Sequence, residues 1–144
     1  MTDESKFHIG IKALITNERN EVLLLKTGPK ENRHTKVEYW DIPGGRIKGS
    51  QNIEETLRRE ITEELGVPGE KLEILEIFDA TISNFKISHS ENVLLMLIVY
   101  RCRLPKDSKF RLSEEHSEWK WTEISAAKKA LSFMLPQVFL DKLG

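Results

Sequence analysis

The chain has 144 residues, and its 22 lysine and arginine residues nearly balance 23 aspartate and glutamate residues, for a formal net charge of −1. That length suits one domain with a substantial hydrophobic core, so we expect residues 1–144 to form a single domain. The balanced charge provides no general attraction to a nucleic-acid polymer or to an anionic membrane.

The predicted elements alternate between strands and helices. Two strands, at 8–16 and 22–27, flank the polar break 17–20 and are expected to form a hairpin. A helix follows at 53–65, then strands at 72–83 and 92–103, the second with an apolar run typical of a fully buried central strand. A short strand around 119–121 precedes helices at 125–131 and 136–143. This order predicts an α/β fold in which helices cover both faces of a mixed β-sheet.

The chain has one cysteine, Cys102, which cannot form an internal disulfide. The N-terminal residues lack an apolar stretch of signal-peptide length, and no later segment approaches the roughly 18 apolar residues of a membrane span. We therefore expect a cytoplasmic protein with no membrane partner.

The helix predicted at 53–65 carries three carboxylates in its last two turns. Glu60, Glu63 and Glu64 lie where the negative end of the helix dipole disfavours acids. Glu60 and Glu64 are also a like-charge pair at i,i+4, beside the apolar stripe of the helix. A bound Mg²⁺ or Mn²⁺ ion would remove both penalties, because hard cations prefer carboxylate oxygens. The spacing thus favours a metal site at the edge of the core, although a glutamate-rich surface helix has the same triplet.

Residues 45–67 resemble the Nudix box, whose pattern is Gly, five residues, Glu, seven residues, Arg-Glu, an aliphatic, any residue, Glu-Glu, any residue, Gly and an aliphatic. The positions in register are Gly45, Arg59, Glu60, Ile61, Glu63, Glu64, Gly66 and Val67, and residues 40–45 are similar to the usual lead-in. One position departs from the pattern, since Gln51 stands where the family has its first glutamate. Glutamine keeps an acceptor and loses the charge.

The resemblance implies a Nudix-type α/β/α sandwich that uses Mg²⁺, or Mn²⁺ as a substitute, to hydrolyse a nucleoside diphosphate linked to another group. It implies Glu60 and Glu64 as first metal ligands, Glu63 as third and the Gly44 carbonyl as a backbone ligand. Arg59 shares a face with Glu63 and is expected to orient the carboxylates. Such a cluster neutralises phosphoryl charge and positions the attacking water.

A further acid is expected from residues 114–121, which are similar to a Glu-His-x-Glu segment before a late strand in many family members. In those relatives an acid of this loop is an extra metal ligand or the general base, which makes Glu115 the candidate here. A solvated polar loop is the competing interpretation. His116 titrates in the right range, but a lone loop histidine is more often structural or exposed.

Substrate contacts are expected from the polar loop at 27–38, where Lys30, Arg33 and Lys36 could hold distal phosphates above the metal site. A charged loop that is only solvated is the alternative. Trp40 could stack on a base, although a tryptophan beside Pro43 equally suits a wedge between the turn and the core.

The box does not specify which group is linked to the nucleoside diphosphate in the substrate. The compact length and the late loop favour a nucleoside triphosphate pyrophosphohydrolase of the nucleotide-sanitising type, giving a nucleoside monophosphate and pyrophosphate. One alternative is hydrolysis of ADP-ribose, a nucleotide sugar or a dinucleoside polyphosphate. Another is a domain that senses nucleotides without turnover, for which Gln51 is the only motivating residue. The sequence also leaves open a homodimer.

Overall fold

The computed structural model describes residues 4–28, 37–88 and 91–144. Its elements, in chain order, are β1 (Lys6–Ile15), β2 (Val22–Thr27), β3 (Tyr39–Asp41), β4 (Gly44–Arg46), α1 (Ile53–Leu65), the 3₁₀ helix η1 (Gly69–Lys71), β5 (Glu73–Ser88), β6 (Val93–Arg103), β7 (His116–Thr122), α2 (Ile124–Leu131) and α3 (Gln137–Leu140).

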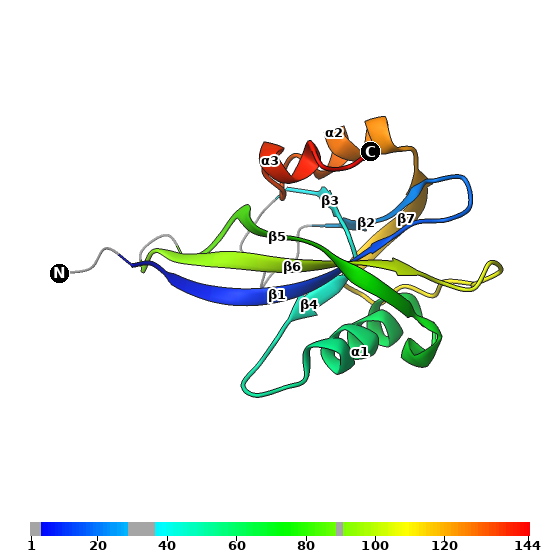
Figure 1. Cartoon of the computed structure of the whole chain (residues 1–144), viewed down its shortest axis with the longest axis horizontal. Helices are drawn as coiled ribbons and strands as arrows, with labels where there is room; N and C mark the ends of the chain where they lie inside the picture. Colours follow the sequence, from blue (N-terminus) through cyan, green and yellow to red (C-terminus); the bar gives the residue numbers. More distant parts are fainter. Residues whose placement is uncertain (1–3, 29–36, 89–90) are drawn as a thin grey trace.

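The strands form two sheets. One has four strands in the order β4-β1-β6-β5, and the other has three in the order β3-β2-β7. The β1–β6 pair is parallel and the other pairs are antiparallel. In Figure 1, α1 lies on one side of the strands and α2 and α3 lie on the other. The predicted α/β fold with a mixed sheet is confirmed.

The predicted hairpin between the first two strands is confirmed at its turn and is wrong along the strands. In the described part of the chain, the two strands are joined by one isolated antiparallel bridge, between Thr16, which follows β1, and Val22 of β2. Asn17 closes the turn, since its side chain accepts hydrogen bonds from the N–H groups of Arg19 and Glu21 at 3.0 Å each. Beyond the turn the strands separate, and β1 joins β6 while β2 joins β7. The turn signal was correct, but strand partners are chosen by burial of both apolar faces, which a local pattern does not report.

Strand β6 is central, as predicted, because it lies between β1 and β5. Its burial alternates, however, with Val93, Leu95, Leu97 and Val99 buried and the residues between them only half-buried. The prediction of a strand fully buried on both faces is therefore wrong. Strand β5 runs to Ser88, further than predicted, and α3 is shorter than predicted.

Two apolar clusters hold the layers together. One joins the sheets to α2 and α3 through residues such as Leu131 and Phe139, and the other joins them to α1 through Leu57, Ile61 and Leu65. The bounds predicted for α1 are confirmed. The Asn52 side chain accepts from the Glu55 N–H at 3.0 Å, and Gly66 ends the helix with φ of 70°. Among the described residues, no helix combines the length and apolar character needed to cross a membrane.

Candidate active site

Helix α1 presents its three carboxylates at different depths. The apolar stripe of Leu57, Ile61 and Leu65 is fully buried. Next to that stripe Glu64 is 5% exposed and Glu60 is half-buried, whereas the Glu63 side chain is 57% exposed. Glu60 and Glu64 therefore lie at the edge of the core, as the helical spacing predicts.

The Glu64 carboxylate accepts a hydrogen bond from a backbone N–H group of β4. The N–H of Gly44, at the start of β4, donates to Glu64 Oε1 at 2.7 Å. The pKa of Glu64 is raised to about 8, chiefly by burial and also by nearby Glu60 and Asp41, against the lowering effect of the Lys12 ammonium and the Gly44 N–H. A buried carboxylate with acidic neighbours is a suitable partner for a cation. The metal-ligand role of the Gly44 carbonyl stays a prediction.

Glu60 lies directly against a glycine of β4. A Cβ atom on Gly45 would be 2.7 Å from each oxygen of the Glu60 carboxylate, so only glycine leaves room for it. Arg59 lies 3.6 Å from the carboxylates of both Glu60 and Glu63. Burial raises the pKa of Glu60, and Glu63 and Glu115 raise it too, against the lowering effect of Arg59. The position of Arg59 between the two carboxylates is the one expected for an arginine that orients them.

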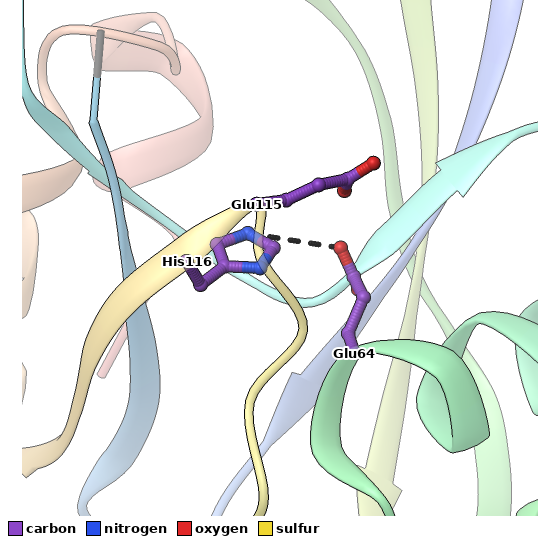
Figure 2. A group of neighbouring side chains, drawn as sticks. All are labelled: Glu64, Glu115 and His116. Atoms are coloured by element: carbon purple, nitrogen blue, oxygen red, sulfur yellow. Dashed lines mark ion pairs between the residues drawn. The ribbon is translucent and has the colours of Figure 1, made fainter. Parts of the chain in front are cut away.

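The segment before β7 brings Glu115 and His116 to the same place. One potential ligand atom from each of Glu64, Glu115 and His116 lies within 4.8 Å of the others. Figure 2 shows the two carboxylates and the imidazole gathered around a common space. His116 Nε2 is 3.7 Å from Glu64 Oε2, and the His116 side chain is only 7% exposed. The structure thus places Glu115 beside the carboxylates of α1 and adds His116, which its residue type alone identified as a weaker candidate.

The sequence did not predict the buried ion pair between Lys12 and Asp41, which lies close enough to Glu64 for an electrostatic interaction. Lys12 Nζ in β1 lies 2.9 Å from Asp41 Oδ2 at the end of β3, with side-chain exposures of 13% and 8%. Although burial lowers the pKa of Lys12, the nearby carboxylates of Asp41 and Glu64 outweigh it and raise the pKa overall. The available signal was a lysine in the middle of the apolar run at 9–15, where a charge requires a buried partner.

The carboxylates line one part of an open cleft of about 1540 Å³. Another part of the lining is apolar and comes from the two sheets and the segment after α2, including Tyr39, Phe85, Ile87, Leu97 and Met134. The lining of the cleft therefore combines carboxylates suited to a cation with apolar side chains suited to a ring.

The expected substrate contacts are only partly described. Lys30, Arg33 and Lys36 lie outside the described residues. Trp40 does not line the cleft with the carboxylates; it lies under Lys120, whose Nζ is 4.2 Å from its ring centroid, and lines a separate pocket. Side chains alternate between the two faces of a strand, so the neighbouring Tyr39 lines the cleft instead. The Tyr39 ring stacks on Phe133 with centroids 5.1 Å apart.

Gln51, the departure from the box, closes the loop before α1. The Gln51 side-chain Oε1 accepts from the Lys48 backbone N–H at 3.3 Å, and the Gln51 backbone N–H donates to the Lys48 carbonyl at 3.4 Å. The side chain is exposed and also lines the cleft. Glutamine therefore keeps the loop contact for which an acceptor is sufficient.

The chain is similar to proteins of one known family. A model of the NUDIX domain matches residues 6–140. Nucleoside triphosphatase NudI of Escherichia coli K12 is 30% identical over 90 residues, which cover 58% of this chain and 61% of that protein. The chain thus spans less than two thirds of the length of the curated relatives it matches.

Two solved structures share the fold. The MutT protein from Methanosarcina mazei Go1 has a TM-score of 0.71 and 30% identity, with 99% of this chain and 94% of that chain covered. An Ap4A hydrolase of C. elegans has a TM-score of 0.69 and 21% identity over 95% and 93% of the two chains, a likeness of fold alone. Because the NUDIX domain model matches residues 6–140, nearly the whole chain, the protein belongs to the Nudix hydrolase family.

Proposed function

We propose that this protein is a metal-dependent pyrophosphohydrolase whose substrate is a nucleoside triphosphate, which it converts to a nucleoside monophosphate and pyrophosphate. The observation that carries the proposal is the convergence of Glu60, Glu64 and Glu115 in a cleft with an apolar wall. The likeness to a nucleoside triphosphatase supports the substrate class. We further propose that it removes oxidised or non-standard nucleotides.

The donor set fits a divalent cation. Burial and neighbouring acids raise the pKa of both Glu60 and Glu64, so the cluster needs compensation by positive charge. Glu60, Glu64 and Glu115 would hold Mg²⁺, or Mn²⁺ in its place, with Glu63 as a more exposed further ligand. When bound, the cation supplies neutralisation of phosphoryl charge and activation of water.

The chain's own residues would position these groups. The Gly44 N–H holds one oxygen of Glu64, which leaves Oε2 on the side of His116. Arg59 restrains Glu60 and Glu63. Glu115 is exposed beside the cluster and is suited to be an additional ligand or to accept the proton of the attacking water.

The apolar wall would take the nucleoside. Tyr39, Phe85 and Met134 offer the flat or flexible apolar surfaces on which a ring packs. Because aromatic and aliphatic surfaces recognise shape more than polar edges, this wall suits a substrate class with more than one base.

The test is product identification. We would incubate the purified protein, with Mg²⁺ or with EDTA, with canonical and oxidised nucleoside triphosphates, ADP-ribose, nucleotide sugars and dinucleoside polyphosphates, and separate the products by anion exchange. Metal-dependent release of monophosphate and pyrophosphate supports the proposal. Turnover restricted to the other compounds, with a phosphorylated partner as product, would move the protein to another branch of the family. Nucleotide binding without turnover would indicate a sensor and make Gln51→Glu the next variant.

A further inference from the structure

The buried pair of Lys12 and Asp41 requires an explanation. The two side chains come from different sheets, meet at 2.9 Å and line the same cleft as the carboxylates. Burying two opposite charges often gives no net stability compared with an apolar pair of the same size. A role in the neighbouring site is therefore the better explanation for such a pair.

Lys12 is in direct contact with the backbone that holds Glu64. In the register of β1 and β4, Lys12 lies opposite Gly44. Gly44 has φ of 148°, and a Cβ atom there would be 2.8 Å from both Cα and Cδ of Lys12. The aliphatic part of Lys12 thus packs on the residue whose N–H binds Glu64.

The ammonium of Lys12 has two carboxylates near it, and Asp41 is the one it binds. Lys12 Nζ donates to Asp41 Oδ2 at 2.9 Å and to the Ile42 carbonyl at 3.3 Å. Asp41 is itself fixed, because its Oδ1 accepts from the Ile42 N–H at 2.8 Å. Glu64 also attracts the ammonium electrostatically. Without the Asp41 carboxylate, Glu64 would be the remaining carboxylate that attracts the buried ammonium.

We infer that Asp41 is a positioning residue that binds the Lys12 ammonium and thereby keeps the Glu64 carboxylate available to a divalent cation. The Lys12–Asp41 pair is neutral as a unit, so it supports the Gly44 turn without repelling a cation. This inference rests on one part of the proposed function, namely that Glu64 and its neighbouring carboxylates bind a divalent cation. It gives neither residue a part in the chemical step.

The test is direct binding of Mn²⁺, without nucleotide, by electron paramagnetic resonance or calorimetry. Asp41→Asn keeps an acceptor for the Ile42 N–H and removes the charge that binds Lys12. We expect it to weaken Mn²⁺ binding by about 10- to 100-fold, the range usual for residues that support metal ligands. Lys12→Met keeps an unbranched stem on Gly44, so the double variant K12M/D41N should recover most of the lost affinity.

A matched control is the pair of Lys142 and Asp79, which has the same 2.9 Å separation in another part of the fold. Asp79→Asn should leave Mn²⁺ binding unchanged. A role limited to folding predicts that K12M and D41N weaken Mn²⁺ binding equally and that the double variant binds no better than either. That result, or unchanged binding by D41N, would overturn the inference.

Two further outcomes separate this inference from the proposed function. If D41N does not fold, the double variant carries the test, because no ammonium remains to compete; a 10- to 100-fold loss of Mn²⁺ affinity in it would overturn the inference. If the wild type itself binds no Mn²⁺, the metal-dependent function fails together with the inference.

Discussion

Replacing Glu64 by glutamine should stabilise the metal-free fold while removing the activity. The carboxyl is 5% exposed, and burial raises its pKa from 4.5 to about 8. Ionisation therefore opposes folding, and the penalty grows as the pH rises from 4.5 to about 8. At pH 7, roughly 2.5 pH units above the ordinary value, it amounts to about 3 kcal/mol as an upper bound.

Glutamine carries no charge and keeps an acceptor for the Gly44 N–H, which lies 2.7 Å from Glu64 Oε1. The pKa of about 8 already includes the attraction of the Lys12 ammonium for Glu64, so the loss of that attraction needs no separate correction. We expect Glu64→Gln to raise the free energy of unfolding at pH 7 in EDTA by about 1–3 kcal/mol. The difference from wild type should vanish below pH 4.5, where the carboxyl of both folded and unfolded chains is protonated. Mg²⁺-dependent turnover should fall on the order of 10³-fold, because the loss of a metal ligand removes several kcal/mol of transition-state stabilisation.

The assay is urea unfolding at pH 4 and pH 7 in EDTA, followed by measurement of pyrophosphate release with Mg²⁺. Glu63→Gln is the matched control, because its side chain is 57% exposed and it should change stability little. A Glu64→Gln variant that is less stable than wild type at pH 7 would show that the buried charge does not oppose folding, and one that keeps a near-normal rate with Mg²⁺ would remove Glu64 from the mechanism.

Three further predictions follow from single contacts. Gly45→Ala should lower kcat at least about tenfold with little change in melting temperature, because the new Cβ would displace the flexible Glu60 carboxylate; an unchanged kcat would contradict this. Gln51→Glu keeps the acceptor for Lys48 and adds a charge beside the cleft, so titration of activity with Mg²⁺ should show about two- to five-fold tighter apparent binding, and weaker binding would count against it. Cys102 is fully buried and burial raises its pKa to about 12, so its thiol should react with Ellman's reagent at pH 8 only after denaturation; rapid reaction of the native protein would show that it is accessible.

Local patterns predicted the elements that specify their own bounds. The helix at 53–65 has an apolar stripe, a capping residue at Asn52 and a terminating Gly66, and each is visible in the sequence. The same periodicity places Glu60 and Glu64 beside the core. By contrast, β3 and β4 have three residues each, too few for an alternating pattern, and they appear only because their partners β2 and β1 pair with them.

The remaining parts of the site depend on contacts between distant segments. Lys12 and Asp41 are 29 residues apart and belong to different sheets. His116 is buried because the start of β7 packs near α1, a contact that no local pattern around the histidine encodes. The choice between Tyr39 and Trp40 depends on which face of β3 each occupies, and that face depends on how β3 pairs with β2. These contacts depend on how the strands pair. The sequence therefore predicted the kind of chemistry at the site, but not every residue that lies there.

The proposed function requires that the carboxylates of α1 and the loop before β7 hold one divalent-cation centre. Crystals soaked in MnCl₂ would reveal the position of the ion in an anomalous difference map. We expect a peak about 2.0–2.4 Å from oxygens of Glu60 and Glu64, with Glu115 in or next to the coordination sphere. A strong peak elsewhere, with no density among these carboxylates, would show that they do not form the metal centre.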